Sequence, residues 1–156
     1  MELKQYKHSS AVGAMYLVAS EENLFGVFWN KQDKISMVAN PQNKILQMTL
    51  AQLEEYFEGT RTEFSIPLSP QGTEFQLKVW KQLQKIPYGK TISYKELATA
   101  VSDPNASRAV GSANGKNPIS IIIPCHRVIA SNGRLAGYAG GVSAKDFLLK
   151  LESQNS

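Results

Sequence analysis

A short segment rich in proline and glycine divides the chain and limits what it can fold into. Residues 66–72 read Ile-Pro-Leu-Ser-Pro-Gln-Gly and separate two stretches whose apolar residues recur at regular spacing. Such a segment between periodic stretches is typical of a linker. A chain of 156 residues can bury one good core or two small ones. We therefore predict two domains, at residues 1–66 and 73–156, joined by a linker at residues 67–72.

The first domain is predicted to combine a small sheet with one helix. Three runs of β-type residues, Ala11–Ala19, Leu24–Trp29 and Lys34–Val38, are separated by polar connectors, a pattern typical of an antiparallel meander. A helix is expected between Pro41 and Gly59, with an apolar stripe every three or four residues. That stripe consists of Leu46, Leu50, Leu53 and Phe57. Nothing in this part of the chain points to catalysis.

The second domain is predicted to be mostly helical. Capping boxes at Thr73-x-x-Gln76 and Ser93-x-x-Glu96 open two helices, of which the first stops at Pro87 and the second runs to about Ala100. A third helix is expected from about Asn105 to Asn114, and two short helices joined by a tight turn describe a helix-turn-helix. A final helix is expected after a cap at Ser143-x-x-Asp146. Its inward residues should be Phe147, Leu148 and Leu151.

The most distinctive stretch is Ile119 to Val128, Ile-Ser-Ile-Ile-Ile-Pro-Cys-His-Arg-Val. Its β-branched run should be extended and buried, and Pro124 should end it. Cys125, the only cysteine, follows directly, and His126 and Arg127 are side chains that can favour a thiolate. Cys125 is therefore either a nucleophile or a buried structural thiol. The local sequence leaves both open.

The charge of the chain is unevenly distributed. Residues 1–72 carry a net charge of −2, whereas residues 73–156 carry +6. A polyanion such as DNA is the natural partner of the second half, although small basic domains also occur that bind nothing in particular. The expected third helix has a low surface of small residues around one long side chain, Arg108, and could approach a nucleic-acid groove closely.

Several classes of protein are disfavoured. No apolar stretch approaches the length of a bilayer span, and the N-terminus lacks the layout of a signal peptide. We expect a cytoplasmic protein, or a nuclear one if the source is eukaryotic. One cysteine and two histidines allow no internal disulfide and no plausible zinc set, so we expect neither a metal nor a cofactor.

The pentapeptide Pro124–Val128 resembles the active-site signature of the O6-alkylguanine-DNA alkyltransferases, also called methylated-DNA–protein-cysteine methyltransferases. The resemblance covers about the second half of the chain. It also takes in Tyr94, the run Ser107–Gly111, Asn117-Pro118, Gly137-Tyr138, Gly140-Gly141 and Glu152.

This resemblance implies an α+β fold. A small N-terminal α/β domain would have a ribonuclease-H-like topology without that chemistry, and a mostly helical C-terminal domain would hold a winged-helix-like helix-turn-helix. The implied function is direct-reversal DNA repair. The alkyl group of O6-alkylguanine, and also of O4-alkylthymine, would pass irreversibly to Cys125 in a single turnover. The helix-turn-helix would enter the minor groove, and the target nucleotide would be flipped out of the stack.

The resemblance also implies a role for individual residues. His126 would take the thiol proton through a water, Glu152 would hold the imidazole, and Tyr94 would hydrogen-bond to N3 of the leaving guanine. Arg108 would fill the gap left by the flipped nucleotide. The other DNA-binding residues would be Ala106, Ala109, Gly111 and Ser93, and the alkylguanine pocket would be formed by Tyr138, Val128, Ala139 and Asn117. Asn117 would also act as a hinge, and at Ala139 some relatives carry a hydroxyl residue.

Two other functions use some of the same features. A cysteine hydrolase would need the same Cys-His-Glu trio and also an oxyanion hole, for which the sequence offers no second signature. A DNA-binding damage sensor would need only the helix-turn-helix, but relatives of that type replace the nucleophile. The partner we expect is double-stranded DNA with an alkylated guanine. We expect a monomer, and the sequence leaves open whether several copies bind DNA cooperatively.

Overall fold

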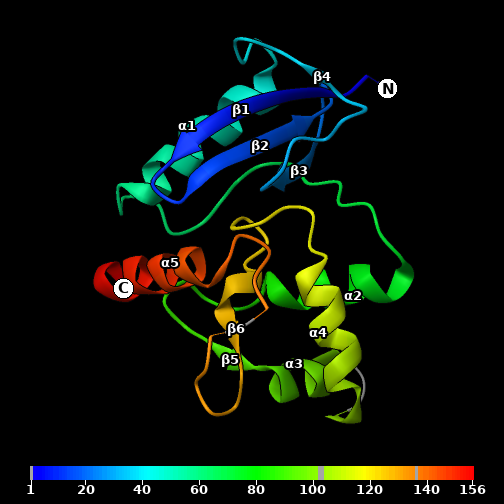
Figure 1. Cartoon of the computed structure of the whole chain (residues 1–156), viewed down its shortest axis with the longest axis vertical. Helices are drawn as coiled ribbons and strands as arrows, with labels where there is room; N and C mark the ends of the chain where they lie inside the picture. Colours follow the sequence, from blue (N-terminus) through cyan, green and yellow to red (C-terminus); the bar gives the residue numbers. More distant parts are fainter. Residues whose placement is uncertain (1, 102–103, 136) are drawn as a thin grey trace. The chain divides into compact units, whose positions relative to one another are not determined.

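The structure, a computed structural model, describes residues 2–101, 104–135 and 137–156. The chain forms two compact units, Met1–Gln71 and Gly72–Ser156. The first holds a four-stranded sheet and one helix, and the second is mostly helical (Figure 1). This succession confirms the predicted α+β class.

The sheet of the first unit has the order β3-β2-β1-β4. Strands β1 (Lys4–Ser10) and β2 (Gly13–Ala19) form an antiparallel hairpin, and β3 (Leu24–Phe28) pairs antiparallel with β2. Strand β4 (Ser36–Met37) pairs parallel with β1 at the other edge. The predicted three-stranded meander is therefore wrong in two respects, because it omitted β1 and placed the last strand beside the second.

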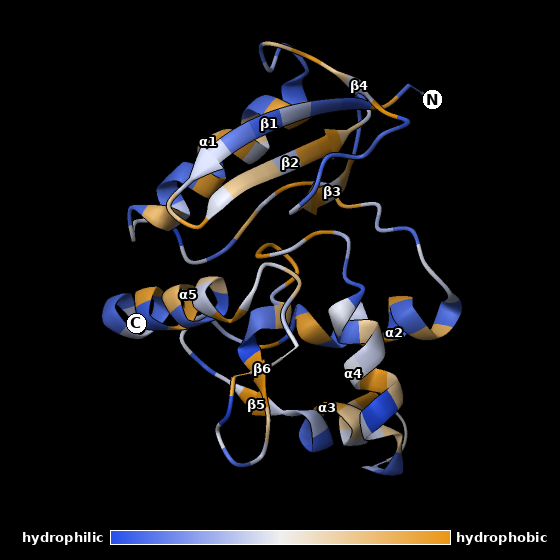
Figure 2. Cartoon of the chain, viewed as in Figure 1, coloured by the Kyte–Doolittle hydropathy of each residue, from blue (hydrophilic) through white to orange (hydrophobic). Residues whose placement is uncertain are grey.

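The reason for this error is the composition of β1. The strand is mostly hydrophilic, whereas β2 and β3 are apolar (Figure 2). Its one fully buried residue is Gln5, whose side-chain amide donates to the carbonyls of Gln32 and Ile35 at 2.9 and 3.1 Å. The side-chain oxygen of Gln5 accepts from the backbone N–H of Gln32 at 2.8 Å. A polar residue thus occupies a core position because the backbone of a loop satisfies it.

Helix α1 (Lys44–Phe57) covers β2 and β3. Asn43 caps it by accepting from the N–H groups of Ile45 and Leu46, as expected of an Asn at this position. Leu46 and Leu53 of the predicted stripe are fully buried, while Leu50 and Phe57 are only half-buried. After the helix, Leu24 forms backbone hydrogen bonds with Pro67 and Ser69, so the start of the expected linker lies beside β3.

The second unit contains a helix-turn-helix. Helices α2 (Glu74–Leu83) and α3 (Tyr94–Val101) both begin with the predicted capping boxes. A 3-10 turn, η1 (Pro104–Ala106), then leads into α4 (Ser107–Gly115), which packs against α2 and α3. The indole of Trp80 on α2 donates to the carbonyl of Ala113 at 2.8 Å and ties the end of α4 to the core.

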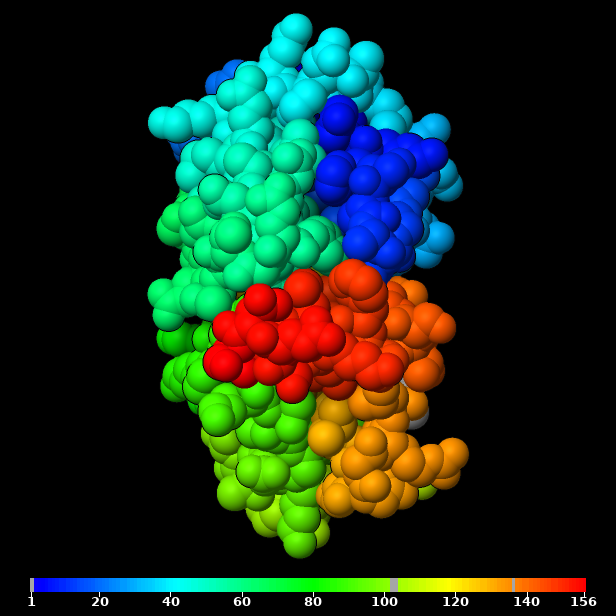
Figure 3. All heavy atoms as spheres, turned by 90° about the vertical axis from the view of Figure 1, so that its left-hand side faces the viewer, coloured from blue at the N-terminus to red at the C-terminus, as the bar shows by residue number. Residues whose placement is uncertain are grey.

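The remaining elements surround the Cys125 region. A 3-10 turn, η2 (Cys125–Arg127), continues into β6 (Val128–Ile129), which pairs parallel with β5 (Ile92–Ser93). Helix α5 (Val142–Asn155) closes the unit and forms a continuous stretch of its surface (Figure 3). The N-cap of this helix is Gly141, not the predicted cap Ser143. Phe147, predicted to face inward, is 40% exposed, whereas Leu148 is buried.

Candidate active site

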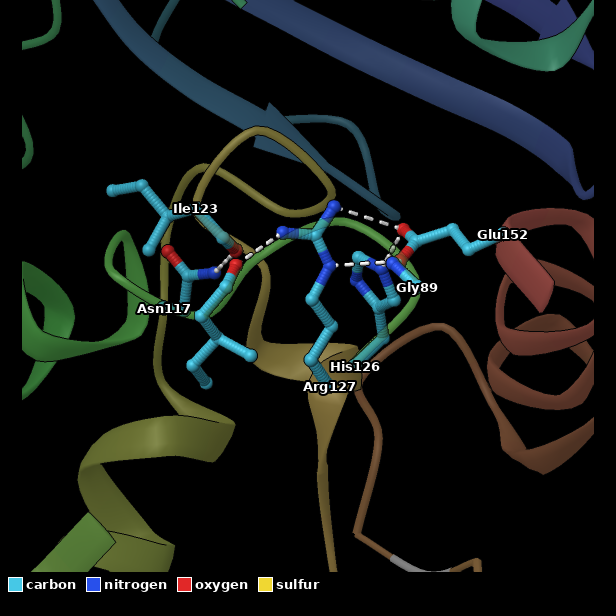
Figure 4. Close-up of polar contacts among 7 residues, drawn as sticks. Gly89, Asn117, Ile123, His126, Arg127 and Glu152 are labelled. Carbon is cyan, nitrogen blue, oxygen red and sulfur yellow. Dashed lines mark hydrogen bonds and ion pairs between the residues drawn. The ribbon is translucent and has the colours of Figure 1, made fainter. Parts of the chain in front are cut away.

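The run Ile119–Ile123 is buried, as predicted, but it is not a strand. It folds into a tight turn, in which the N–H of Ile123 donates to the carbonyl of Ile119 at 3.0 Å and Ile121 has a φ of 72°. Positive φ is strained for a β-branched residue. Asn117 holds the turn. Its amide donates to the carbonyl of Ile123 at 2.7 Å (Figure 4), and its oxygen accepts from the N–H of Ile119 at 3.0 Å.

Cys125 lies at the start of η2, directly after this turn, and is 4% exposed. Burial raises the pKa of its thiol to about 11, although a hydrogen bond with Asn117 and the charge of Lys145 oppose the rise. The expectation that His126 and Arg127 favour the thiolate is therefore not met. Both of these side chains are directed to Glu152 instead. At rest Cys125 is a protonated thiol.

His126, Arg127 and Glu152 form one buried cluster (Figure 4). The Nε2 of His126 lies 2.6 Å from Oε2 of Glu152. Arg127 donates from Nε to Oε1 at 2.8 Å and from Nη2 to Oε2 at 3.1 Å. The N–H of Gly89 also donates to Oε1, at 3.1 Å. The carboxylate, on α5, thus joins η2 to the segment before β5.

The pKa values of Glu152 and His126 are both lowered in this cluster. Burial opposes ionisation of Glu152, but its hydrogen bonds and charge interactions with His126 and Arg127 prevail and lower its pKa to about 2. Burial lowers the pKa of His126, and the charges of Arg127 and Lys145 act in the same direction, against Glu152. The cluster therefore holds a carboxylate and a neutral imidazole. A neutral imidazole can accept a proton.

Tyr94 and Tyr138 lie close enough to Cys125 to sense its charge. Burial raises the pKa of both phenols, and a thiolate at Cys125 would raise it further. The ring of Tyr138 stands edge-on to the imidazole of His126 at 6.5 Å between centroids. Gly137 faces the hydroxyl of Tyr94, because a Cβ at Gly137 would lie 3.6 Å from that oxygen. Both tyrosines thus remain protonated donors.

The other residues expected in the pocket lie in different environments. Val128 is fully buried, and its carbonyl accepts from Nζ of Lys145 at 2.7 Å. Ala139 is exposed, in the turn before α5, and Asn117 supports the backbone behind Cys125.

Two polar residues of the site were missed by the sequence analysis. Asn114, near the end of α4, is buried, donates to the carbonyl of Cys125 at 3.3 Å and hydrogen-bonds with Tyr94. Lys145, on α5, is 1% exposed. The spacing that turns Leu148 inward also places Lys145 on the inner face, three residues earlier, so helical periodicity could have identified Lys145.

The residues predicted to contact DNA lie around the helix-turn-helix. Arg108 and Ala109 are exposed on α4, while Ala106, at its N-terminus, and Gly111 are half-buried. Ser93 caps α3 through the N–H of Glu96. The predicted turn before Asn105 includes Ser102 and Asp103, which lie outside the described residues.

The described residues contain neither a membrane-spanning helix nor a metal-ligating cluster. No helix among them combines the length and the apolar character needed to cross a bilayer. Nor do the histidines, cysteine and carboxylates of that part of the chain gather in threes, as a metal site would require.

Comparison with known proteins gives matches over nearly the whole chain. Residues 4–70 match the family model of the 6-O-methylguanine DNA methyltransferase ribonuclease-like domain, and residues 74–154 match the DNA binding domain of the same family. A methylated-DNA–protein-cysteine methyltransferase of Methanosarcina barkeri is 47% identical over 149 residues, 94% of each chain.

Solved structures of O6-methylguanine methyltransferases are also similar to this chain. An O6-methylguanine methyltransferase of Mycobacterium tuberculosis superposes with a TM-score of 0.90 at 39% identity, over 99% of this chain and 94% of that one. A structure of Mycobacterium tuberculosis OGT in complex with DNA has a TM-score of 0.90 at 40% identity, over 98% and 94% of the two chains.

Proposed function

Because the chain belongs to the 6-O-methylguanine DNA methyltransferase family, we propose that it repairs DNA by transferring the alkyl group of O6-alkylguanine to Sγ of Cys125. The observation that carries this proposal is the placement of the only cysteine, buried at η2, directly before an imidazole held by a buried carboxylate. A thiolate is a suitable nucleophile for a saturated carbon. The Sγ–C bond forms as the C–O6 bond breaks.

The thiol must lose its proton during the reaction, since its pKa of about 11 keeps it protonated at rest. His126 is the base. Its Nε2 faces Glu152, and its Nδ1 has no hydrogen-bond partner among the described residues, which suits it to receive a proton through a water. The imidazolium that forms is stabilised by the carboxylate 2.6 Å away.

The departing guanine needs a hydrogen-bond donor, because it is a poor leaving group as an anion. Tyr94 supplies that donor at N3, and its raised pKa ensures that the hydroxyl carries its proton at neutral pH. Tyr138 forms one wall of the pocket for the flipped guanine. Val128 and Asn117 shape the pocket, and the small exposed Ala139 stands at its edge.

Access to the alkyl carbon requires the nucleotide to leave the duplex. In support, Arg108 is the only long side chain on the exposed part of α4, between Ala106, Ala109 and Gly111, so the helix can enter the minor groove and Arg108 can fill the vacated position. Ser93 anchors the preceding helix beside the DNA. We include O4-alkylthymine as a second substrate, since it presents the same O-alkyl carbon.

Intact-mass measurement tests the proposal. Mixed with duplex DNA containing O6-methylguanine, the protein should gain the mass of one methyl group, located on Cys125 by peptide mapping. Cys125→Ala should bind the same DNA and gain nothing, because the nucleophile is gone while the basic surface remains. Methyl transfer by Cys125→Ala would overturn the assignment, and release of free methanol would identify a hydrolase instead.

A further inference from the structure

Arg127 is part of the signature pentapeptide, and its side-chain nitrogens hydrogen-bond to Glu152 and Ile86. The residue is 6% exposed. Two of its nitrogens bind the two oxygens of Glu152, and Nη1 donates to the carbonyl of Ile86 at 2.7 Å. The ring of Tyr88 covers the guanidinium at 5.7 Å. This geometry fixes the guanidinium against a single carboxylate.

The charges around His126 can be counted from every element packed on it. Helix α5 contributes the carboxylate of Glu152 and the ammonium of Lys145, and η2 contributes Arg127 itself. The loop before α5 contributes the phenol of Tyr138, and the segment before β5 contributes Tyr88 and the N–H of Gly89. Arg127 already balances Glu152. A proton on His126 would therefore add an unbalanced charge to a buried site, which is costly.

We propose that Arg127 is a positioning residue that neutralises Glu152 and thereby keeps His126 unprotonated, ready to accept the proton of the Cys125 thiol. Without Arg127, Glu152 would still face the imidazole, and a proton on His126 would become the nearest way to balance the carboxylate, because the ammonium of Lys145 donates to the carbonyl of Val128. The histidine would then be protonated before the thiol could use it. This inference rests on the proposed function for its consequence, but the charge balance can be tested without any alkyl transfer.

The test is a titration of His126 by NMR. The chain has only two histidines, so protein labelled with 15N-histidine gives two imidazoles, and His8→Gln assigns them. In Arg127→Gln the pKa of His126 should rise by about one unit or more, because a neighbouring cation has been removed. In Arg127→Lys, which keeps the charge, it should stay near the parental value. In Glu152→Gln it should fall.

These opposite directions separate charge balance from mere support of the fold. If Arg127 and Glu152 only exclude water, both Gln variants should move the pKa of His126 the same way, upward to the ordinary value of about 6.5. That result would overturn the inference. Should Arg127→Gln fail to fold because it leaves a buried carboxylate without its cation, the double variant Arg127→Gln/Glu152→Gln removes both charges. The pKa of His126 should then be higher in the double variant than in Glu152→Gln, and an equal pKa in the two would overturn the inference.

The same variants connect the titration with the reaction. As the pH is lowered, the rate of methyl transfer from O6-methylguanine in DNA should fall when His126 becomes protonated. In Arg127→Gln this fall should occur at a higher pH than in the parent, by the same number of pH units as the pKa shift seen by NMR. A fall at the parental pH would show that Arg127 does not affect the reaction through His126. A parent protein that transfers no methyl group would overturn the proposed function and leave the titration result standing.

Discussion

At the scale of single residues, burial decides the resting protonation state of the Cys125 thiol. The position of Cys125 beside His126 and Arg127 in the sequence favoured a thiolate, but adjacency along the chain does not set the direction of a side chain. Both neighbours turn to Glu152, a residue far along the sequence, and the sulfur is left in an environment that raises its pKa to about 11. Cys125 could be proposed as the nucleophile from sequence. Its protonation state depended on contacts that only the fold defines.

This difference predicts a slow reaction with ordinary thiol reagents. At pH 7.5 a rise of about two pKa units leaves about 100-fold less thiolate than an unfolded chain would have. Iodoacetamide should therefore modify the native protein at least about 100-fold more slowly than the same protein in urea, as followed by intact mass. Cys125→Ala should remain unmodified in both conditions. Equal rates in the native and unfolded protein would show that the thiol is neither buried nor raised in pKa.

At the scale of elements, the capping boxes at Thr73 and Ser93 were predicted correctly, whereas the cap at Ser143 and the Ile119–Ile123 turn were not. Thr73 and Ser93 satisfy backbone donors within three residues, so the local sequence contains the whole interaction. The turn, by contrast, places a β-branched residue at positive φ against its own preference. It persists because the side chain of Asn117 satisfies both of its ends. β-propensity alone favours a strand here, and the overriding contact is made by a residue outside the run.

Helix α4 provides the prediction at this scale. If Arg108 stabilises the flipped nucleotide, Arg108→Ala should slow methyl transfer from duplex DNA by about 100-fold, the scale of a few kcal/mol of unstacking. Free O6-benzylguanine needs no flipping and should react at nearly the parental rate. The measurement is the single-turnover rate constant of parent and variant, once with duplex DNA and once with free O6-benzylguanine.

Arg134→Ala is the matched control, since Arg134 is another exposed arginine of the second unit, shortly after the turn at Ser131-Asn132. It removes the same charge and should weaken binding only through salt-dependent phosphate contacts. An equal loss on the duplex and on the free base in Arg108→Ala would show that Arg108 acts within the pocket and not on the extruded nucleotide.

At the scale of the whole molecule, the order of a sheet-containing unit followed by a helical one was predictable, and the pairing within the sheet was not. Helices can be recognised from apolar periodicity and capping residues within a short stretch of sequence. The parallel pairing of β1 with β4 joins Gln5 to Met37 across a hairpin and a loop, and β1 carries too few apolar residues to be recognised alone. The charge division, −2 before residue 73 and +6 after it, places the anion-attracting surface on the unit that holds Cys125.

The composition of the whole chain also sets how many times it can act. Attack on an alkyl carbon leaves Cys125 as a thioether, which has no polarised carbonyl or phosphorus for water to attack, so His126 would find nothing to hydrolyse. The chain has no second cysteine to receive the group. With excess O6-methylguanine DNA, product should therefore plateau at about one equivalent per protein, with second-order kinetics and no steady state. Quantifying repaired DNA against protein over a range of ratios gives the answer, and product well above one equivalent would mean that the thioether is not the end of the reaction.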